Sequence, residues 1–366
     1  MNSAVELLQN LIRIPSVNPE GDPGVTNPGE KACAEFLAQF LTECGAETEL
    51  REVLPGRPNI LARFPSSRPG KPKLLFAPHT DTVSVRGMTI DPFGGELRDE
   101  RIWGRGASDT KGPMAAMLWA LKEAGPKLED LSHEIWFAGL MGEEAGLHGS
   151  KALAEQETFD FVVIGEPTDL KTVYTHKGSS WITLKTKGKS VHASTPHLGV
   201  NAIEMMYEVI QALKQRFAVA KTAARHPILG EATLNVGTIV GGSKINIVPD
   251  HCEACIDIRT VPDLDLDSLL EMLRAQFPEL EISATHSTPL FTDPNHALVK
   301  TLAECGGEGV PAPWFCDAAS FAAKGTPAVA IGPGSIAQAH TADEWIRVED
   351  LEKGVKFFGH FLQKLV

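Results

Sequence analysis

Two things are scarce in this sequence of 366 residues, long apolar runs and positive charge. No run approaches the roughly 18 apolar residues that a membrane-spanning helix needs, so no membrane span is predicted. The 34 basic residues are outnumbered by 47 acidic ones, which gives a formal charge of −13. A nucleic-acid-binding surface is usually basic, so this balance argues against broad binding of DNA or RNA.

No secretory signal is predicted at the N-terminus. Residues 2–19 contain an acid within the apolar stretch and have no small-residue cleavage site. They predict an amphipathic helix instead, because Ser3 and Glu6 have capping-box spacing and the apolar residues between Val5 and Ile12 form one stripe. Without a signal, the six scattered cysteines are expected to be free thiols in the reducing cytoplasm.

Metal-binding cysteine pairs and phosphate-binding loops are absent as well. Cys252 and Cys255 form a C-x-x-C, but no second pair exists, and residues three apart on a strand face opposite sides. The glycines at 104–106 do not form a G-x-x-x-x-G-K-[ST] loop. The sequence also has no internal repeat, and residues 18–30 form only a Gly/Pro-rich loop. Any metal chemistry must therefore use other ligands.

What the chain does contain is an α/β pattern long enough for two domains. Helical and short apolar strand segments alternate, which predicts a mostly parallel mixed sheet covered by helices. The expected helices span 3–13, 29–45, 112–124 and 348–365, and the expected buried strands span 73–78, 134–140, 159–165 and 327–334.

The stretch 178–286 has a different pattern. It predicts the order β-α-β-β-α-β, which is typical of a small α+β domain with its helices on one face of an antiparallel sheet. The chain is thus expected to have an α/β domain made of 1–177 and 287–366, interrupted by an inserted ferredoxin-like domain.

Histidines and acids stand where these strands end. His79 follows an apolar strand, and Asp81, two positions on, points to the same side. Asp81 is therefore expected to reach the second nitrogen of the imidazole or another metal-site group. A His–Asp pair at a solvated strand end is an equal alternative for this feature alone.

The remaining candidates repeat this layout. They are Asp109 in a Gly-rich turn before a helix, the pair Glu143 and Glu144, Glu166, and His340. Asp109 alone could serve as a helix cap. Because ligands in open α/β sheets sit at the carboxyl ends of strands, the whole set predicts one site. Two imidazoles and several carboxylates suit zinc, cobalt or manganese, and their number suffices for two ions and one unligated acid.

Seven motifs occur along almost the whole chain in a fixed order: HTDTV, GRGASDTKG, GEEAG, GEPTDL, VHASTPHLGVNAI, DIRTVPD and GPGSIAQAHTADEW. Together they resemble the motifs of a known family. It is the co-catalytic zinc metallopeptidase family that includes acetylornithine deacetylase, succinyl-diaminopimelate desuccinylase and glutamate-releasing carboxypeptidase. The resemblance implies two Zn²⁺, with Co²⁺ or Mn²⁺ as substitutes. It assigns one metal to His79, Asp109 and Glu166 and the other to Asp109, Glu144 and His340. It also implies a cis peptide bond after the bridging Asp109.

The resemblance gives the other residues their roles. Glu143 would be the general base that takes a proton from water and passes it to the leaving amine, and Asp81 would position the site. His192 would polarise the substrate carbonyl from the partner subunit of a homodimer formed through the inserted lid and dimerisation domain. Asn246 and Arg259 would hold the α-carboxylate of the substrate. Taken by themselves, His192 and Arg259 could equally be a loop histidine and a surface charge.

The same resemblance ranks the substrates. N-acetyl-ornithine or a similar N-acyl amino acid comes first, succinyl-diaminopimelate second, and a dipeptide or acyl-glutamate third. Desuccinylases usually carry a GTSD-like stretch where this chain has FCDAASF, at 315–321. A non-catalytic metal-binding relative is the alternative of another class, although such a chain would be expected to have lost a ligand or the base. The nine other histidines are interpreted as structural or exposed.

Overall fold

The computed structural model describes residues 1–20, 22 and 29–366. It divides into two compact units, one made of 1–175, 291–310 and 316–366, the other of 176–290 and 311–315. We expected the insertion at 178–286, and the short segment 311–315 has no counterpart in that expectation. The Gly/Pro-rich loop expected at 18–30 lies largely outside the described residues.

The first unit contains a nine-stranded mixed sheet with a parallel centre. The pairs β6–β3, β3–β7 and β7–β15 are parallel, whereas β1–β2, β2–β6 and β15–β8 are antiparallel. The sheet therefore has the predicted fold class, mixed and parallel at its centre. Its strands in spatial order are β1 (Glu47–Leu54), β2 (Arg57–Arg63), β6 (Glu134–Gly139), β3 (Lys73–Pro78), β7 (Phe161–Gly165), β15 (Ala328–Ala330), β8 (Thr172–His176) and β13 (Leu290–Phe291), with β14 (Gly309–Ala312) beside β8.

Both faces of the central strands are buried, as their continuous apolar runs predict. On β3, Leu74 and Phe76 belong to a core formed with helices from both ends of the chain, while Leu75 and Ala77 are buried on the opposite face. The helices that contribute to the first core are α1 (Ala4–Ile12), α2 (Glu30–Glu43), α3 (Lys111–Ala124), α7 (Ala297–Glu304) and α9 (Val348–Gln363). The helices α4 (His148–Gln156) and α8 (Ala318–Ala322) contact each other, and α8 also contacts β7 and β15.

The N-terminal helix begins as predicted. Ser3 caps α1 by accepting a hydrogen bond from the Glu6 N–H (3.1 Å). The Glu6 carboxylate accepts from the Asn2 N–H (2.7 Å) instead of the Ser3 N–H, so the capping box closes one residue early. No helix among the described residues has both the length and the apolar character needed to cross a membrane.

A small three-stranded sheet in the first unit was not predicted. It joins β4 (Glu96–Arg98), β5 (Arg101–Trp103) and β16 (Trp345–Arg347) in antiparallel pairs. Through β5 and β16 it brings the chain just before Asp109 next to the chain just after His340. A 3₁₀ turn at Gly125–Asp130 follows α3.

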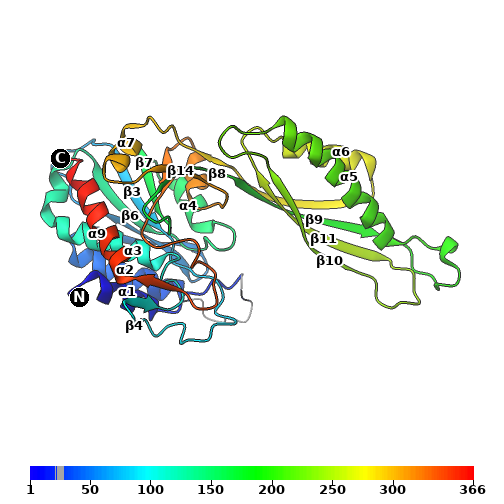
Figure 1. Cartoon of the computed structure of the whole chain (residues 1–366), viewed down its shortest axis with the longest axis horizontal. Coiled ribbons are helices and arrows are strands. Elements are labelled where there is room, and N and C mark those ends of the chain that lie inside the picture. Colours follow the sequence, from blue (N-terminus) through cyan, green and yellow to red (C-terminus); the bar gives the residue numbers. More distant parts are fainter. Residues whose placement is uncertain (21, 23–28) are drawn as a thin grey trace. The chain divides into compact units, whose positions relative to one another are not determined.

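The second unit has the predicted β-α-β-β-α-β order. Its four-stranded antiparallel sheet follows the order β10–β11–β9–β12, and both long helices lie on one face of it (Figure 1). Cys252 is buried and Cys255 faces the other side, so the C-x-x-C is no metal pair, and both thiols are free. The elements are β9 (Gly178–Lys187), a 3₁₀ turn (Pro196–Leu198), α5 (Ala202–Ala223), β10 (Thr233–Gly241), β11 (His251–Thr260), α6 (Leu266–Gln276) and β12 (Glu281–Ser287).

Candidate metal centre

Three neighbouring strands of the central sheet end in candidate residues. Glu143 follows β6, His79 follows β3 and Glu166 follows β7, and these strands are adjacent and parallel. The strand-exit argument is wrong for Asp109, which precedes α3 and follows no strand of this sheet. His340 lies ten residues beyond Ala330, so a loop and not the strand end positions it.

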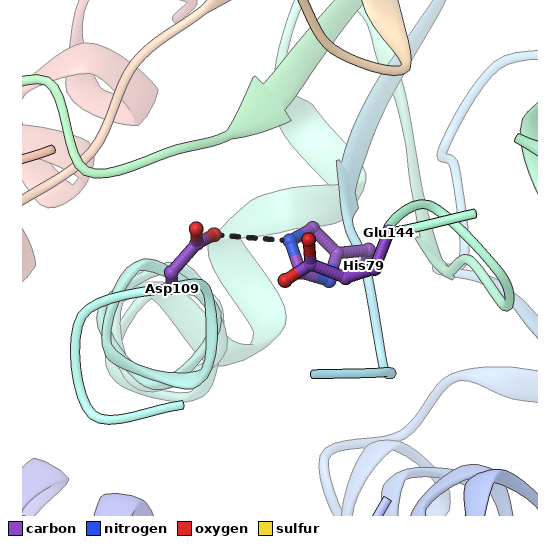
Figure 2. A group of neighbouring side chains, drawn as sticks. All are labelled: His79, Asp109 and Glu144. Carbon is purple, nitrogen blue, oxygen red and sulfur yellow. Dashed lines mark hydrogen bonds and ion pairs between the residues drawn. The ribbon is translucent and has the colours of Figure 1, made fainter. Parts of the chain in front are cut away.

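Asp109 stands between two imidazoles. Its Oδ1 lies 3.1 Å from Nε2 of His79, and its Oδ2 lies 3.4 Å from Nε2 of His340 (Figure 2 draws the first contact). His340 Nε2 also lies 3.0 Å from Glu144 Oε2, while the buried Glu144 Oε1 has no hydrogen-bond partner. A carboxylate whose two oxygens face different imidazoles has the arrangement needed to bridge two cations.

The backbone around Asp109 ties the site together. The Asp109–Thr110 peptide bond is cis, as the family resemblance implied. The Thr110 hydroxyl donates a hydrogen bond to the carbonyl oxygen of Gly165, the residue before Glu166. The start of α3 and the exit of β7 are thereby joined directly.

The two imidazoles hold protons tightly when no cation is present. Hydrogen bonds with Asp109 and Glu144 raise the pKa of His340 to about 10. Burial alone would lower the pKa of His79, but its hydrogen bonds with Asp109 and Asp81 raise it well above the ordinary value. Burial would likewise raise the pKa of Asp109, yet the contacts with His340 and His79 hold it well below its usual range. These groups form a dense set of ion pairs that a metal would replace.

The buried acids Glu143, Glu144 and Glu166 are not stabilised enough by neighbouring imidazoles to offset the effect of burial on their pKa. Burial raises the pKa of Glu143 and of Glu166 well above the ordinary value, and neighbouring acids add to the rise. Burial also raises the pKa of Glu144, although its hydrogen bond with His340 opposes the rise. Acids that are crowded in a buried place favour either protonation or a bound cation.

The donor set fits a divalent metal. Ligand atoms of His79, Asp109 and Glu144 all lie within 4.8 Å of one another (Figure 2). Imidazole nitrogens and carboxylate oxygens are the ligands of zinc sites with an open position. This group contains His79 from one of the two ligand sets that the resemblance implied, Glu144 from the other, and Asp109, which both sets share.

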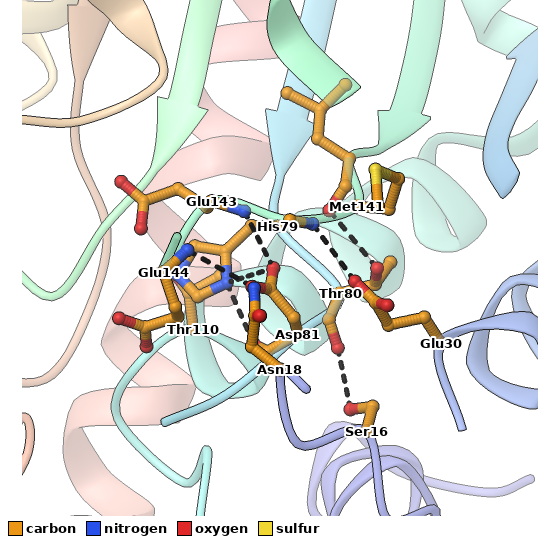
Figure 3. Close-up of polar contacts among 12 residues, drawn as sticks. Ser16, Asn18, Glu30, His79, Thr80, Asp81, Thr110, Met141, Glu143 and Glu144 are labelled. Atoms are coloured by element: carbon orange, nitrogen blue, oxygen red, sulfur yellow. Dashed lines mark hydrogen bonds and ion pairs between the residues drawn. The ribbon is translucent and has the colours of Figure 1, made fainter. Parts of the chain in front are cut away.

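Asp81 holds the turn that carries the two glutamates. Its Oδ1 accepts a hydrogen bond from the Glu143 N–H (3.0 Å), and its Oδ2 accepts from the Glu144 N–H (3.1 Å) and from Nδ2 of Asn18 (2.7 Å) (Figure 3). The second nitrogen of His79, Nδ1, lies 2.9 Å from the backbone oxygen of Asp81 and 3.5 Å from its carboxylate. We expected the side chain to orient the imidazole, but the carbonyl does so more closely.

Two further side chains hold the same turn, and no sequence motif predicts them. Asn59 Oδ1 accepts from the Met141 N–H (2.9 Å). Glu30, labelled in Figure 3, accepts through Oε1 from the Gly142 N–H (3.0 Å). Glu30 also accepts hydrogen bonds from the buried Arg57 guanidinium. Together with Asp81, these residues satisfy four consecutive backbone N–H groups, from Met141 to Glu144.

Asp317 is another acid near the site. It lies in the FCDAASF stretch at 315–321 but was not predicted as a site residue. Asp317 is fully buried, and neither of its carboxylate oxygens has a hydrogen-bond partner. Burial raises its pKa to about 7. The nearby Ser150 hydroxyl lowers the pKa somewhat, but it is hydrogen-bonded to Ser320 Oγ (2.8 Å) and leaves Asp317 unsatisfied. Its charge raises the pKa of Glu143 and Glu166.

The three predicted residues of the inserted domain lie at two ends of one sheet. His192 is exposed, its Nδ1 is 2.7 Å from Ser194 Oγ, and it bridges to Ile247, next to Asn246. Arg259 is near the far end of β11, where it pairs with Asp257 (3.0 Å). Within a single chain, His192 and Asn246 are therefore neighbours, and Arg259 is separated from them by most of the length of β11.

Residues 75–364 match the sequence model of peptidase family M20/M25/M40, which is more than half of the chain. The chain belongs to this family. The acetylornithine deacetylase of Proteus mirabilis is 32% identical over 377 residues, covering 98% of this chain and 96% of the relative. That of Photorhabdus laumondii is 33% identical over 360 residues, covering 93% and 92%.

Solved M20 structures share the fold. A metallo-carboxypeptidase of the M20 family from Sulfolobus solfataricus has a TM-score of 0.81 at 22% identity and covers 100% of this chain and 99% of its own. A dinuclear metal-binding M20 peptidase from Bacillus subtilis has a TM-score of 0.68 at 14% identity and covers 99% and 97%. The chain is thus an M20 metallohydrolase, and its family relatives include an enzyme with a two-metal site.

Proposed function

We propose that this M20 enzyme uses two divalent ions to remove the acyl group from an N-acyl amino acid, with N-acetyl-ornithine as the first candidate. The observation that carries the two-metal part is Asp109, whose two oxygens face two different imidazoles. The substrate part rests on nearly full-length similarity to acetylornithine deacetylases.

The proposed ligands follow from this arrangement. His79, Asp109 and Glu166 would hold one ion, and Asp109, Glu144 and His340 the other. The unpartnered Oε1 of Glu144 supports its role as a ligand, because a buried oxygen without a hydrogen bond is costly unless something else binds it. Zn²⁺ is the first choice, and Co²⁺ or Mn²⁺ suit the same donors. When bound, such ions lower the pKa of a water molecule and polarise the amide carbonyl.

The residues of the chain would then divide the proton chemistry. Glu143 has no assigned ligand role, and its backbone is fixed by Asp81, so its carboxylate is placed to accept a proton from the attacking water. The same group would deliver the proton to the leaving amine. Glu144 stands next to it but is engaged by His340. Neighbouring acids in different environments are a common way to separate two roles.

The inserted domain would complete the site from a second copy of the chain. His192 and Asn246 lie at one end of the sheet and Arg259 near the other, so one copy is poorly suited to bring all three to a single substrate. We assign Arg259 to the α-carboxylate, for which a planar guanidinium is well suited. Asn246 would assist it, and His192 would polarise the carbonyl.

The same domain offers a surface for dimer formation. β10 is an edge strand in the described sheet, and the apolar side chains of Ile239, Val240 and, on α5, Tyr207 are exposed. An open edge with apolar side chains favours pairing with another strand. We therefore propose a homodimer that forms through this edge.

The proposal is tested by loading the protein with Zn²⁺ and measuring amine release from a matched panel. The panel contains N-acetyl-ornithine, N-acetyl-norvaline, succinyl-diaminopimelate and a glutamate-releasing dipeptide. We expect the highest kcat/KM for N-acetyl-ornithine. N-acetyl-norvaline has the same carbon side chain and α-carboxylate but no terminal ammonium group, so it reports how much that group contributes.

Other outcomes separate the alternatives. Preference for the succinylated substrate would favour a desuccinylase, and preference for the dipeptide would favour a peptidase, as in the structurally similar M20 carboxypeptidase. No release from any substrate by the fully loaded protein would favour a non-catalytic metal-binding protein.

A further inference from the structure

Glu344 is a buried carboxylate beside the candidate metal centre, and the family resemblance gives it no role. Glu344 is fully buried, four residues after His340 and directly before β16. Its Oε1 accepts hydrogen bonds from the Ser108 N–H (2.7 Å) and the Asp109 N–H (2.8 Å). Its Oε2 accepts from the Gly106 N–H (3.0 Å) and from Nη1 of Arg105 (2.8 Å).

With these four bonds, each oxygen of the Glu344 carboxylate accepts two hydrogen bonds. Three donors are backbone amides of the loop that leads into Asp109, and one of them is the amide of Asp109 itself. The fourth donor is the buried guanidinium of Arg105, which provides the opposite charge. Hydrogen bonds to an ionised acceptor are stronger than neutral ones, so this array fixes the loop more firmly than ordinary turn contacts would.

The segment around Glu344 is joined to the Asp109 loop at three other points. The Gly104 N–H donates to the Glu344 carbonyl oxygen (3.0 Å), and the Ser108 hydroxyl donates to the Trp345 carbonyl oxygen (3.0 Å). Arg105 Nη2 donates to the Thr341 carbonyl oxygen (3.1 Å). Segments 104–109 and 341–345 are therefore held together by several hydrogen bonds and are expected to move as one unit.

We propose that Glu344 is a positioning residue that keeps Asp109 and His340 at the distance needed to share one metal ion. It acts through the backbone of Asp109 on one side and through its own short connection to His340 on the other. It contacts neither the metal nor the substrate. This inference rests on the proposed ligand roles of Asp109 and His340, and it adds a residue that sets their separation.

The alternative is that Glu344 merely stabilises the fold. A matched control exists in Glu134, another buried glutamate, which accepts hydrogen bonds from Nε of Arg63 (2.7 Å) and Nε1 of Trp136 (2.8 Å). Glu134 begins β6, at the opposite end of that strand from Glu143. Glu134→Gln thus disturbs the ion pair of a buried glutamate with the half-exposed Arg63, without touching the loop of Asp109.

The experiment measures Zn²⁺ affinity by chelator competition for the full-length wild type, Glu344→Gln and Glu134→Gln, together with the Tm of each metal-free protein. We expect both variants to lower Tm. Only Glu344→Gln should weaken binding of at least one ion, by about 10–100-fold, the usual effect of removing a group that orients a ligand. If Glu344→Gln does not fold, Glu344→Asp keeps the charge for Arg105 while drawing the carboxylate away from Asp109, and the same loss is expected.

The outcomes are distinguishable. Unchanged Zn²⁺ affinity in a folded Glu344 variant, with a lower Tm like that of Glu134→Gln, would overturn this inference and leave the proposed function intact. A wild-type protein that binds fewer than two ions would instead contradict the ligand assignment itself.

Discussion

At the scale of single residues, the adjacent acids Glu143 and Glu144 differ in what surrounds them. Glu144 contacts His340 and has one unpartnered oxygen, whereas the pKa of Glu143 is raised well above its usual value by burial and by nearby acids. Their side chains are therefore suited to different tasks although their backbones share one anchor, Asp81.

Exchanging each acid for its amide should separate the two tasks. Glu143→Gln is expected to keep both ions and to lose kcat by about 10²–10⁴-fold, the contribution of a general base. Glu144→Gln should lose metal first and activity as a result. Elemental analysis with steady-state kinetics checks both variants, and loss of metal from Glu143→Gln would exclude it as an unligated base.

The imidazoles predict a pH dependence of metal binding. The pKa of His340 in the metal-free protein is raised to about 10 by Asp109 and Glu144, so its proton stabilises the metal-free fold fully below its ordinary pKa of 6.5. That contribution is lost as the pH rises through about 10. If His340 is a metal ligand, as proposed, the metal must displace this proton at neutral pH, and the apparent metal affinity should therefore increase with pH.

Calorimetry at pH 7 in two buffers of different ionisation enthalpy measures this displacement. We expect release of at least about two protons when Zn²⁺ saturates the protein, because the pKa of His79 is raised as well and a proton on the buried Glu166, whose pKa is also raised, would add to them. His340→Gln should release about one proton fewer. Binding without proton release would contradict the protonated state of both imidazoles.

At the scale of secondary-structure elements, β6 is packed so closely at its last residue, Gly139, that a side chain there would force its neighbours to shift. A Cβ at Gly139 would lie 2.7 Å from Ile60 Cγ2 and 2.9 Å from side-chain atoms of both Leu37 and Thr80. The turn with Glu143 and Glu144 begins two residues later. Core packing in β6 is thus coupled to the position of the site.

Two Gly→Ala substitutions of opposite sign test this packing. Gly139→Ala is expected to destabilise the protein by about 1–3 kcal/mol through overpacking. Gly359→Ala, in α9, has open space around the added methyl group and should stabilise by about 0.5–1 kcal/mol. Urea unfolding of the metal-free proteins gives both values, and equal effects at the two positions would contradict the packing argument.

The elements that the sequence predicted well are those with a strong local pattern. The apolar run at 73–78 corresponds to β3 and the amphipathic stripe after Ser3 to α1. The hairpin of β1 and β2 was missed, because β1 is mostly half-exposed or exposed and lacks a clear alternation. The strands β4, β5 and β16 are three residues each, too short to leave a pattern.

The residues of the candidate site also fall into two groups, those that sequence motifs predict and those that only the fold reveals. Residues with metal-binding side chains, such as His79 and Asp109, were recognisable from motifs, and the contacts bring them together. Asn59 and Glu30 act on backbone amides of a turn that is distant in sequence, and no local pattern reveals such a pairing. Glu344 lay inside a recognised motif, but only the fold connects it to Asp109.

At the scale of the whole molecule, the proposed site needs two chains. His192 and Arg259 lie toward opposite ends of the sheet in the inserted domain, and exposed apolar side chains line its edge. If His192 serves the partner's metal centre, then two variants that are inactive alone should restore each other when they form a mixed dimer.

Co-expression of His192→Ala and Glu143→Ala with different affinity tags tests this. In the mixed dimer, one site has both native residues and the other has neither, so about half of the wild-type activity is expected. Glu143→Ala carrying both tags is the matched control and should stay inactive. A mixed dimer without activity would place His192 in its own subunit's site, and full activity of the His192→Ala homodimer would show that His192 serves no site.

The anchoring of the Met141–Glu144 turn has a consequence for redesign. Asn59, Glu30 and Asp81 hold this turn through its main-chain amides, so these hydrogen bonds do not depend on which side chains the turn carries. If Glu144 is a metal ligand, as proposed, another donor residue can replace it at position 144 while the backbone of the turn stays in place. A histidine there would shift the donor set toward nitrogen and should move the enzyme's preference from manganese toward zinc, cobalt or nickel.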